Sequence, residues 1–135
     1  MARVLVVEDQ AENLELMVYL LQAFGHQTLT AGNGAEGVAA VSRDHPDLVI
    51  MDLQMPVMDG YEAARLLKAD PAVAAIPLVA VTAYAMVGDR ERIMACGFDG
   101  YMTKPIDPQT FVRELERYLA PSASGIVARQ PLQEG

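Results

Sequence analysis

The sequence is poor in cysteine, tryptophan and positive charge. Its 135 residues include one cysteine, Cys96, and no tryptophan, and 10 Lys and Arg residues stand against 18 Asp and Glu, for a formal net charge of −8. A single cysteine excludes an internal disulfide framework and fits a reducing compartment. Together with two isolated histidines, His26 and His45, it does not supply the ligand set of a zinc site.

The acidic balance and the absence of long apolar runs exclude further classes. An excess of negative charge disfavours a surface that follows nucleic-acid phosphates or docks on an anionic membrane. No run approaches the roughly 18 apolar residues that a membrane helix needs, and the first residues lack the layout of a signal peptide. We therefore expect one cytoplasmic domain with no nucleic-acid partner and no membrane insertion.

Short apolar runs predict the strands of a parallel sheet. Residues 4–7, 48–51 and 78–81 are continuously apolar and rich in β-branched side chains, which is typical of strands buried on both faces. Weaker runs at 28–30 and 101–103 predict strands nearer the edges. Because segments with helical spacing separate these runs, the order predicts an α/β fold with helices on both faces of the sheet.

The helical segments have recognisable ends. Their apolar residues recur at helical spacing over 14–21, 35–39, 63–67, 89–96 and 111–119. Asp107 followed by Pro108 predicts the start of the last helix. His26 and His45 lie beside turn signals, and we expect both to be solvated. The pattern ends at Pro121, so we expect a domain over 1–120 and a flexible tail or linker over 121–135.

Polar residues end several of the predicted strands. Glu8 and Asp9 follow the first, Asp52 follows the third, Thr82 ends the fourth and Lys104 follows the fifth. In open α/β sheets, ligands bind outside the carboxyl ends of the strands. The fold therefore predicts that three carboxylates, a hydroxyl and an ammonium group meet at one edge of the sheet.

These side chains are suited to phosphoryl transfer. Three carboxylates so close repel one another, so either one is protonated or a cation lies among them. An all-oxygen set suits Mg²⁺ better than zinc. Lys104 offers a compact positive charge and Thr82 a hydroxyl donor to a phosphoryl group, and a carboxylate can attack phosphorus to form an aspartyl-phosphate.

The same residues, in this order, resemble the response-regulator receiver family, the CheY-like domains of two-component signalling. The resemblance covers residues 3 to about 119 and includes five motifs: Val-Val-Glu-Asp at 6–9, Met-Asp-Leu-Gln-Met-Pro at 51–56, Met-Asp-Gly at 58–60, Val-Thr-Ala at 81–83 and Tyr-Met-Thr-Lys-Pro at 101–105. It is similar to the DivK-type single-domain regulators or the receivers of hybrid kinases, from which it departs at Gln10, where Asn is usual. The resemblance implies a flavodoxin-like (βα)5 doubly wound fold with strand order 2-1-3-4-5.

It also implies roles for single residues. Asp52 would be the phosphoacceptor, and Mg²⁺ would be bound by Asp9, Asp52 and the backbone carbonyl of Gln54, with Glu8 assisting largely through water. Lys104 and Thr82 would contact the phosphoryl group. The bond from Lys104 to Pro105 is typically cis in this family.

The resemblance further implies a switch and its partners. Thr82 and Tyr101 would move together on phosphorylation, and Gln54 and Tyr84 would tune the lifetime of the phosphoryl group. The phosphoryl donor would be a histidine kinase or a histidine phosphotransfer protein. A downstream protein would bind through the helix at Asp89–Cys96, Tyr101 and the helix at Phe111–Leu119. We expect a monomer or weak homodimer that is not an enzyme beyond assisting its own phosphoryl transfer and slow dephosphorylation.

Three other functions are alternatives to this one. A phosphatase of the haloacid-dehalogenase type needs a second Asp two residues after the nucleophile, where this chain has Gln54, which cannot act as a proton donor. A flavodoxin-type flavin module needs a phosphate-binding loop after the first strand, where Glu8 and Asp9 would repel phosphate. An adaptor independent of phosphorylation stays open. With no output domain expected after residue 119, the chain is either a stand-alone regulator or a receiver from a larger protein.

Overall fold

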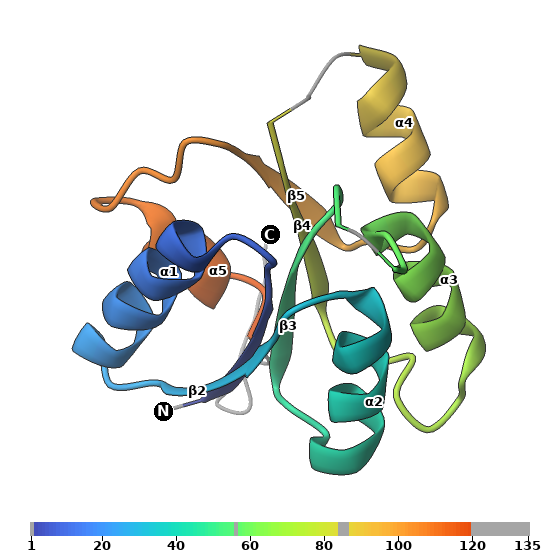
Figure 1. Ribbon diagram of the computed structural model, residues 1–135, viewed down its shortest axis with the longest axis horizontal. Helices are drawn as coiled ribbons and strands as arrows, with labels where there is room; N and C mark the ends of the chain where they lie inside the picture. Colours follow the sequence, from blue (N-terminus) through green and yellow to red (C-terminus); the bar gives the residue numbers. More distant parts are fainter. Residues whose placement is uncertain (1, 56, 84–86, 120–135) are drawn as a thin grey trace, which may run out of the picture.

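A computed structural model describes residues 2–55, 57–83 and 87–119 of the chain. A parallel sheet forms its centre, with strand order β2-β1-β3-β4-β5, and helices cover both faces (Figure 1). The strands are β1 (Arg3–Val7), β2 (Gln27–Ala31), β3 (Leu48–Asp52), β4 (Leu78–Thr82) and β5 (Gly100–Thr103). The predicted α/β class, the flavodoxin-like topology and the edge positions of the two weaker strands are confirmed.

Within the described residues, five helices alternate with these strands. They are α1 (Ala11–Ala23), α2 (Gly34–Asp44), α3 (Gly60–Ala69), α4 (Val87–Ala95) and α5 (Phe111–Glu116). Figure 1 shows α1 and α5 on one face of the sheet and α2, α3 and α4 on the other. No helix in the described part of the chain is long and apolar enough to cross a membrane.

The side-chain alternation of the central strands divides the core into two layers. In β1, Val4 and Val6 pack with α1 and α5, whereas Leu5 and Val7 pack with α2 and α3. Residues of β3 alternate in the same way, because Val4 pairs with Leu48 in register. Strands with both faces buried have no polar alternation, which explains the continuous apolar runs in the sequence.

The last helix is shorter than predicted at both ends. Asp107 and Pro108 open a turn over residues 108–110, and α5 begins only at Phe111. The Asp107 carbonyl accepts from the N–H groups of both Thr110, at 3.2 Å, and Phe111, at 3.0 Å. The aspartate therefore caps a tight turn that leads into the helix. At the other end, hydrogen bonds between residues three apart, as in a 3₁₀ turn, replace the α-helical ones. The helix α5 therefore ends at Glu116 and not at Leu119.

The prediction that His26 is solvated is wrong. Its side chain is buried, and Nδ1 accepts a hydrogen bond from the Ala2 N–H at 3.1 Å. Nε2 lies 2.8 Å from a carboxylate oxygen of Glu116. Because Nδ1 is an acceptor, the proton is on Nε2 and is donated to Glu116. His26 thus joins the start of β1 to the end of α5. His45 is exposed, as expected.

Replacing His26 should destabilise the fold. The His26→Ala change leaves the buried Ala2 N–H without its acceptor, which costs about 1–3 kcal/mol. Urea unfolding at neutral pH measures the loss. The matched control is His45→Asn, because His45 is exposed and has a left-handed backbone (φ 46°) that asparagine tolerates. Equal unfolding free energies for the two variants would contradict the role of His26.

Candidate functional site

Three carboxylates meet at the carboxyl end of the sheet. Glu8 and Asp9 directly follow β1, and Asp52 is the last residue of β3, the neighbouring strand. One oxygen from each lies within 4.8 Å of the others. Glu8 and Asp52 are buried, whereas Asp9 is exposed. The structure therefore brings together the acidic residues that the strand-end pattern predicted.

Lys104 lies between the two buried carboxylates. Its Nζ is 3.4 Å from Glu8 Oε1 and 3.4 Å from Asp52 Oδ2. Its backbone N–H donates to the carbonyl of Thr82 at 2.8 Å, which fixes the chain after β5 beside the end of β4. The peptide bond from Lys104 to Pro105 is cis, as expected. One ammonium group thus faces two carboxylates at equal distance.

Burial changes the ionisation of Glu8. The pKa of Glu8 rises from 4.5 to about 7. The larger cause is the burial of the carboxyl group, and the second is repulsion from Asp52, although Lys104 acts in the opposite direction. Glu8 Oε2 accepts from the Gln10 N–H at 3.2 Å. Within the described residues, Glu8 Oε1 has an ion pair with Lys104 but no hydrogen bond.

The cluster fits a hard divalent cation. Its donors are all oxygen, three carboxylates oppose one ammonium, and a buried carboxylate oxygen lacks a hydrogen bond. Burial is the main cause of the raised Glu8 pKa, and a bound cation would relieve the repulsion from Asp52 that adds to it. Oxygen donors of this kind suit Mg²⁺. Glu8, Asp9 and Asp52 are the side chains that could hold it.

Thr82 and Gln54 complete the polar rim. Thr82 is buried at the end of β4, and its hydroxyl donates to the Gln54 side-chain oxygen at 3.4 Å. The Gln54 N–H donates to Asp52 Oδ1 at 3.3 Å. Gln54 therefore connects the hydroxyl of Thr82 with the carboxylate of Asp52, a link that sequence patterns gave no means to predict. Tyr84 lies outside the described residues, and its role in the phosphoryl lifetime stays a prediction.

The loop after Asp52 leads into α3 and brings that helix close to the site. Asp59 caps α3 by accepting from the Glu62 N–H at 3.0 Å. A Cβ on Gly60 would lie 2.6 Å from the Asp52 carbonyl oxygen, so only glycine lets α3 approach the site this closely. Val57 has a left-handed backbone (φ 71°) and is 83% exposed. For a β-branched residue this conformation is strained.

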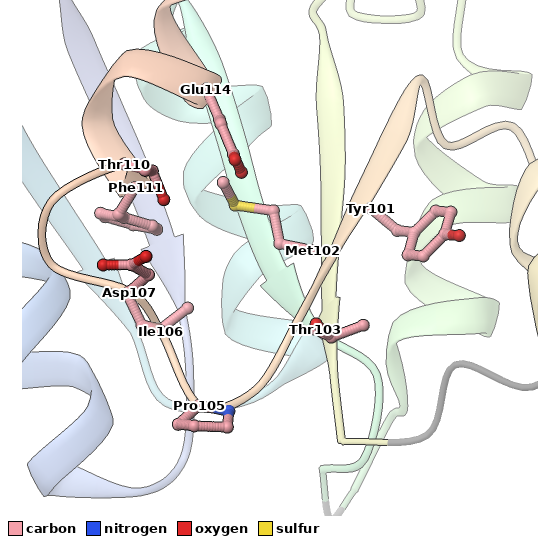
Figure 2. Close-up of a pocket in the computed structure, with 9 residues that line it drawn as sticks. All are labelled: Tyr101, Met102, Thr103, Pro105, Ile106, Asp107, Thr110, Phe111 and Glu114. Carbon is pink, nitrogen blue, oxygen red and sulfur yellow. The ribbon is translucent and has the colours of Figure 1, made fainter.

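A hollow lies beside β5. It has a volume of about 410 Å³ and includes Met102, Phe111 and Glu114 in its lining. Figure 2 shows Met102 on the α5 side of β5 and the Tyr101 ring on the opposite side of the strand. Tyr101, the predicted switch residue, is half-buried, and the Arg90 guanidinium lies 6.0 Å from its ring centre.

The raised Glu8 pKa predicts how stability depends on pH without metal. Between pH 4.5, where unfolded Glu8 titrates, and about pH 7, the folded state holds more protons than the unfolded state. The contribution of Glu8 to stability is therefore greatest below pH 4.5 and decreases as the pH rises through 7, by up to about 3 kcal/mol.

Urea unfolding in EDTA, compared between wild type and Glu8→Gln over this range, isolates the effect. The difference between the two curves should grow in favour of the variant as the pH rises, because glutamine stays neutral. Glu12→Gln, on the exposed surface of α1, is the control and should leave the wild-type pH dependence in place. Parallel curves for wild type and Glu8→Gln would contradict the assigned pKa.

Comparison with known proteins supports one family. Residues 4–116 match the model of the response regulator receiver domain. Among curated proteins, the chain is similar to the polar-differentiation response regulator DivK of Brucella ovis, with 40% identity over 116 residues, 86% of this chain and 94% of DivK. DivK of Brucella anthropi is similar to the same extent.

Solved structures give the same result. The signal receiver domain of a signal transduction histidine kinase from Syntrophus aciditrophicus has a TM-score of 0.84 and 32% identity, over 98% of this chain and 100% of that one. The receiver domain of a sensor histidine kinase from Pseudomonas aeruginosa PAO1 has a TM-score of 0.80 and 32% identity, over 87% and 96% of the two chains. It was solved with a magnesium ion coordinated in its active site cleft. The chain belongs to the response regulator receiver domains of two-component signalling.

Proposed function

We propose that this receiver domain is a phosphorylatable switch with Asp52 as its phosphoacceptor. A carboxylate oxygen of Asp52 attacks the phosphorus of a phosphohistidine, the P–N bond breaks, and the imidazole leaves with the electron pair of that bond. The donor is a histidine kinase or a histidine phosphotransfer protein. The observation that carries the proposal is the position of Asp52, which adjoins two further carboxylates and lies 3.4 Å from the Lys104 ammonium.

Each neighbouring group has a part in this transfer. Glu8, Asp9 and Asp52 would hold Mg²⁺, together with the backbone carbonyl of Gln54. When bound, the ion neutralises the negative charge that gathers around the transferred group. Lys104 is already near the Asp52 oxygen and can follow the phosphoryl group with little movement. Because these charges are fixed in place beforehand, they favour the transfer without a large reorganisation.

The switch connects the site to a protein-binding surface. The buried Thr82 hydroxyl changes its acceptor from Gln54 to the phosphoryl oxygen, and Tyr101 on the neighbouring strand changes its position with it. The new contacts shift an equilibrium between two arrangements. The downstream protein binds across α4, Tyr101 and α5, where the hollow beside β5 offers both apolar and acidic side chains.

The protein acts in the cytoplasm as a signalling component and not as an enzyme on a separate substrate. Gln54 lies two residues after Asp52, and its amide is not acidic enough to donate a proton to a leaving group. Its catalytic contribution is limited to accepting the phosphoryl group and to its slow hydrolysis.

Incubation with acetyl phosphate and Mg²⁺ tests the phosphoacceptor. Intact mass should show one added phosphoryl group that is labile in alkali, and EDTA should prevent its formation. Asp52→Asn should abolish it, because the amide is a poor nucleophile. Asp59→Asn, which changes an aspartate in the same loop away from the cluster, is the control and should be phosphorylated. Undiminished labelling of Asp52→Asn would overturn the assignment.

The metal site is tested by a single truncation. Asp9→Ala removes one of the three carboxylates, and we expect Mg²⁺ affinity to fall by at least about tenfold, or about 1.4 kcal/mol. Isothermal titration calorimetry or NMR titration measures it. Glu12→Ala, one turn away on α1, serves as the control for general loss of negative charge. If both variants bind Mg²⁺ equally, the carboxylate cluster is not the metal site.

A further inference from the structure

Helix α4 packs on the domain with fewer buried apolar side chains than the other helices. Of its described side chains, only Ile93 is buried, whereas Arg90, Glu91, Arg92 and Met94 are exposed. Figure 1 shows that the C-terminal end of α4 lies next to α3, while its beginning extends away from it. Other contacts must therefore fix the position of this helix.

Three side-chain contacts join α3 to α4 and the segment that follows. Residues 61, 65 and 68 share one face of α3, and residues 92, 96 and 99 repeat the same spacing on the other side. The contacts are Tyr61 with Arg92, Arg65 with Cys96 at 3.6 Å, and Lys68 with Asp99 at 3.2 Å. One face of α3 thus contacts α4 at Arg92 and the segment after it at Cys96 and Asp99.

The segment that follows α4 is held in place by several contacts. Lys68 donates to the carbonyls of Ala74 and Ile76 as well as to Asp99, which also accepts from the Leu78 N–H at 2.8 Å. Gly97 has φ +104°, and a Cβ there would lie 2.6 Å from Lys68 Cγ. The chain just after α4 is therefore tied to α3 through Lys68 and to the start of β4 through Leu78.

The pair closest to the acidic site is a cation stacked on an aromatic ring. The Arg92 guanidinium lies 3.9 Å from the ring centre of Tyr61, which is 6% exposed. Arg90 lies 6.0 Å from Tyr101, at the outer limit for such an interaction, so the Arg92 contact is the stronger one. Arg92 and Tyr61 line a cavity of about 500 Å³ together with Leu53 and Gln54, which directly follow Asp52.

We propose that Arg92 is a positioning residue whose stacking on Tyr61 holds α4 against α3 in the resting arrangement of the switch. The segment over residues 97–99 acts as the fixed point, and the stack opposes movement of the helix that precedes it. Helix α4 follows Thr82 in the chain. When Thr82 moves toward a phosphoryl group, α4 can move only if the contact between Arg92 and Tyr61 breaks. The inference rests on the proposed phosphorylation of Asp52.

Loss of the contact between Arg92 and Tyr61 should increase the rate at which Asp52 is phosphorylated. Because Arg92→Ala destabilises the resting arrangement, the initial rate with acetyl phosphate and Mg²⁺ should rise about two- to fivefold, the factor expected for an exposed cation–aromatic contact. Arg92→Met, which keeps the aliphatic stem but not the charge, should behave like Arg92→Ala. Arg92→Lys keeps a cation and should restore most of the wild-type rate. Glu91→Ala, on the exposed face of the same helix, is the control and should be unchanged.

Two measurements test directly whether Arg92 stacks on Tyr61 and holds α4. Burial raises the pKa of the Tyr61 phenol, and the Arg92 cation opposes that rise. In NMR of protein with ring-labelled tyrosine, assigned with Tyr61→Phe, Arg92→Ala should therefore move the Tyr61 titration to higher pH, whereas Glu91→Ala should not. Amide hydrogen exchange of α4 should become about two- to fivefold faster in Arg92→Ala, with β1 and β3 unchanged.

The outcomes separate this inference from the proposed function. If wild type is phosphorylated and Arg92→Ala has the wild-type rate, the positioning role is wrong and the phosphoacceptor stands. If wild type takes up no phosphoryl group, the proposed function is wrong, and the exchange of α4 amides still decides whether Arg92 holds the helix. Unchanged exchange in both Arg92→Ala and Arg92→Met would overturn the inference in every case.

Discussion

The repulsion between carboxylates at the end of the sheet is the constraint on which the site depends. Glu8 and Asp52 are both buried, and their oxygens face a single ammonium group from Lys104. Such an arrangement costs free energy in the absence of a further cation. The fold maintains it because β1, β3 and β5 are fixed by apolar side chains on both faces. The stability of the core thus supports a cluster of charges that would not assemble on its own.

Much of the architecture was accessible from the sequence. Continuous runs such as residues 4–7 and 48–51 predict buried parallel strands, and polar residues directly after such runs predict where a site lies. The strand order came from the family resemblance, because apolar periodicity does not determine which strands are neighbours. Asp9, Asp52 and Lys104 were found because each follows a different predicted strand.

Other features depend on contacts that no local pattern encodes. His26 stands beside a turn signal, and its partner Glu116 is 90 positions away in the sequence. The Tyr61–Arg92 contact joins two helices, and only the fold shows which of their faces meet. The start of α5 was misplaced because Asp107 and Pro108 favour a tight turn as readily as a first helical turn. These residues were missed because their roles come from tertiary neighbours.

The His26 contact also determines where the polypeptide enters and leaves the domain. His26 binds the backbone of Ala2 and the carboxylate of Glu116, so both ends of the described fold meet at the amino ends of the strands. The acidic cluster lies at the opposite end, roughly 17 Å away along a five-residue strand. A segment joined before or after the domain would therefore be attached far from Asp52. Information about the state of Asp52 would have to cross the sheet or travel along its helical surface, because the peptide connections begin at the remote end.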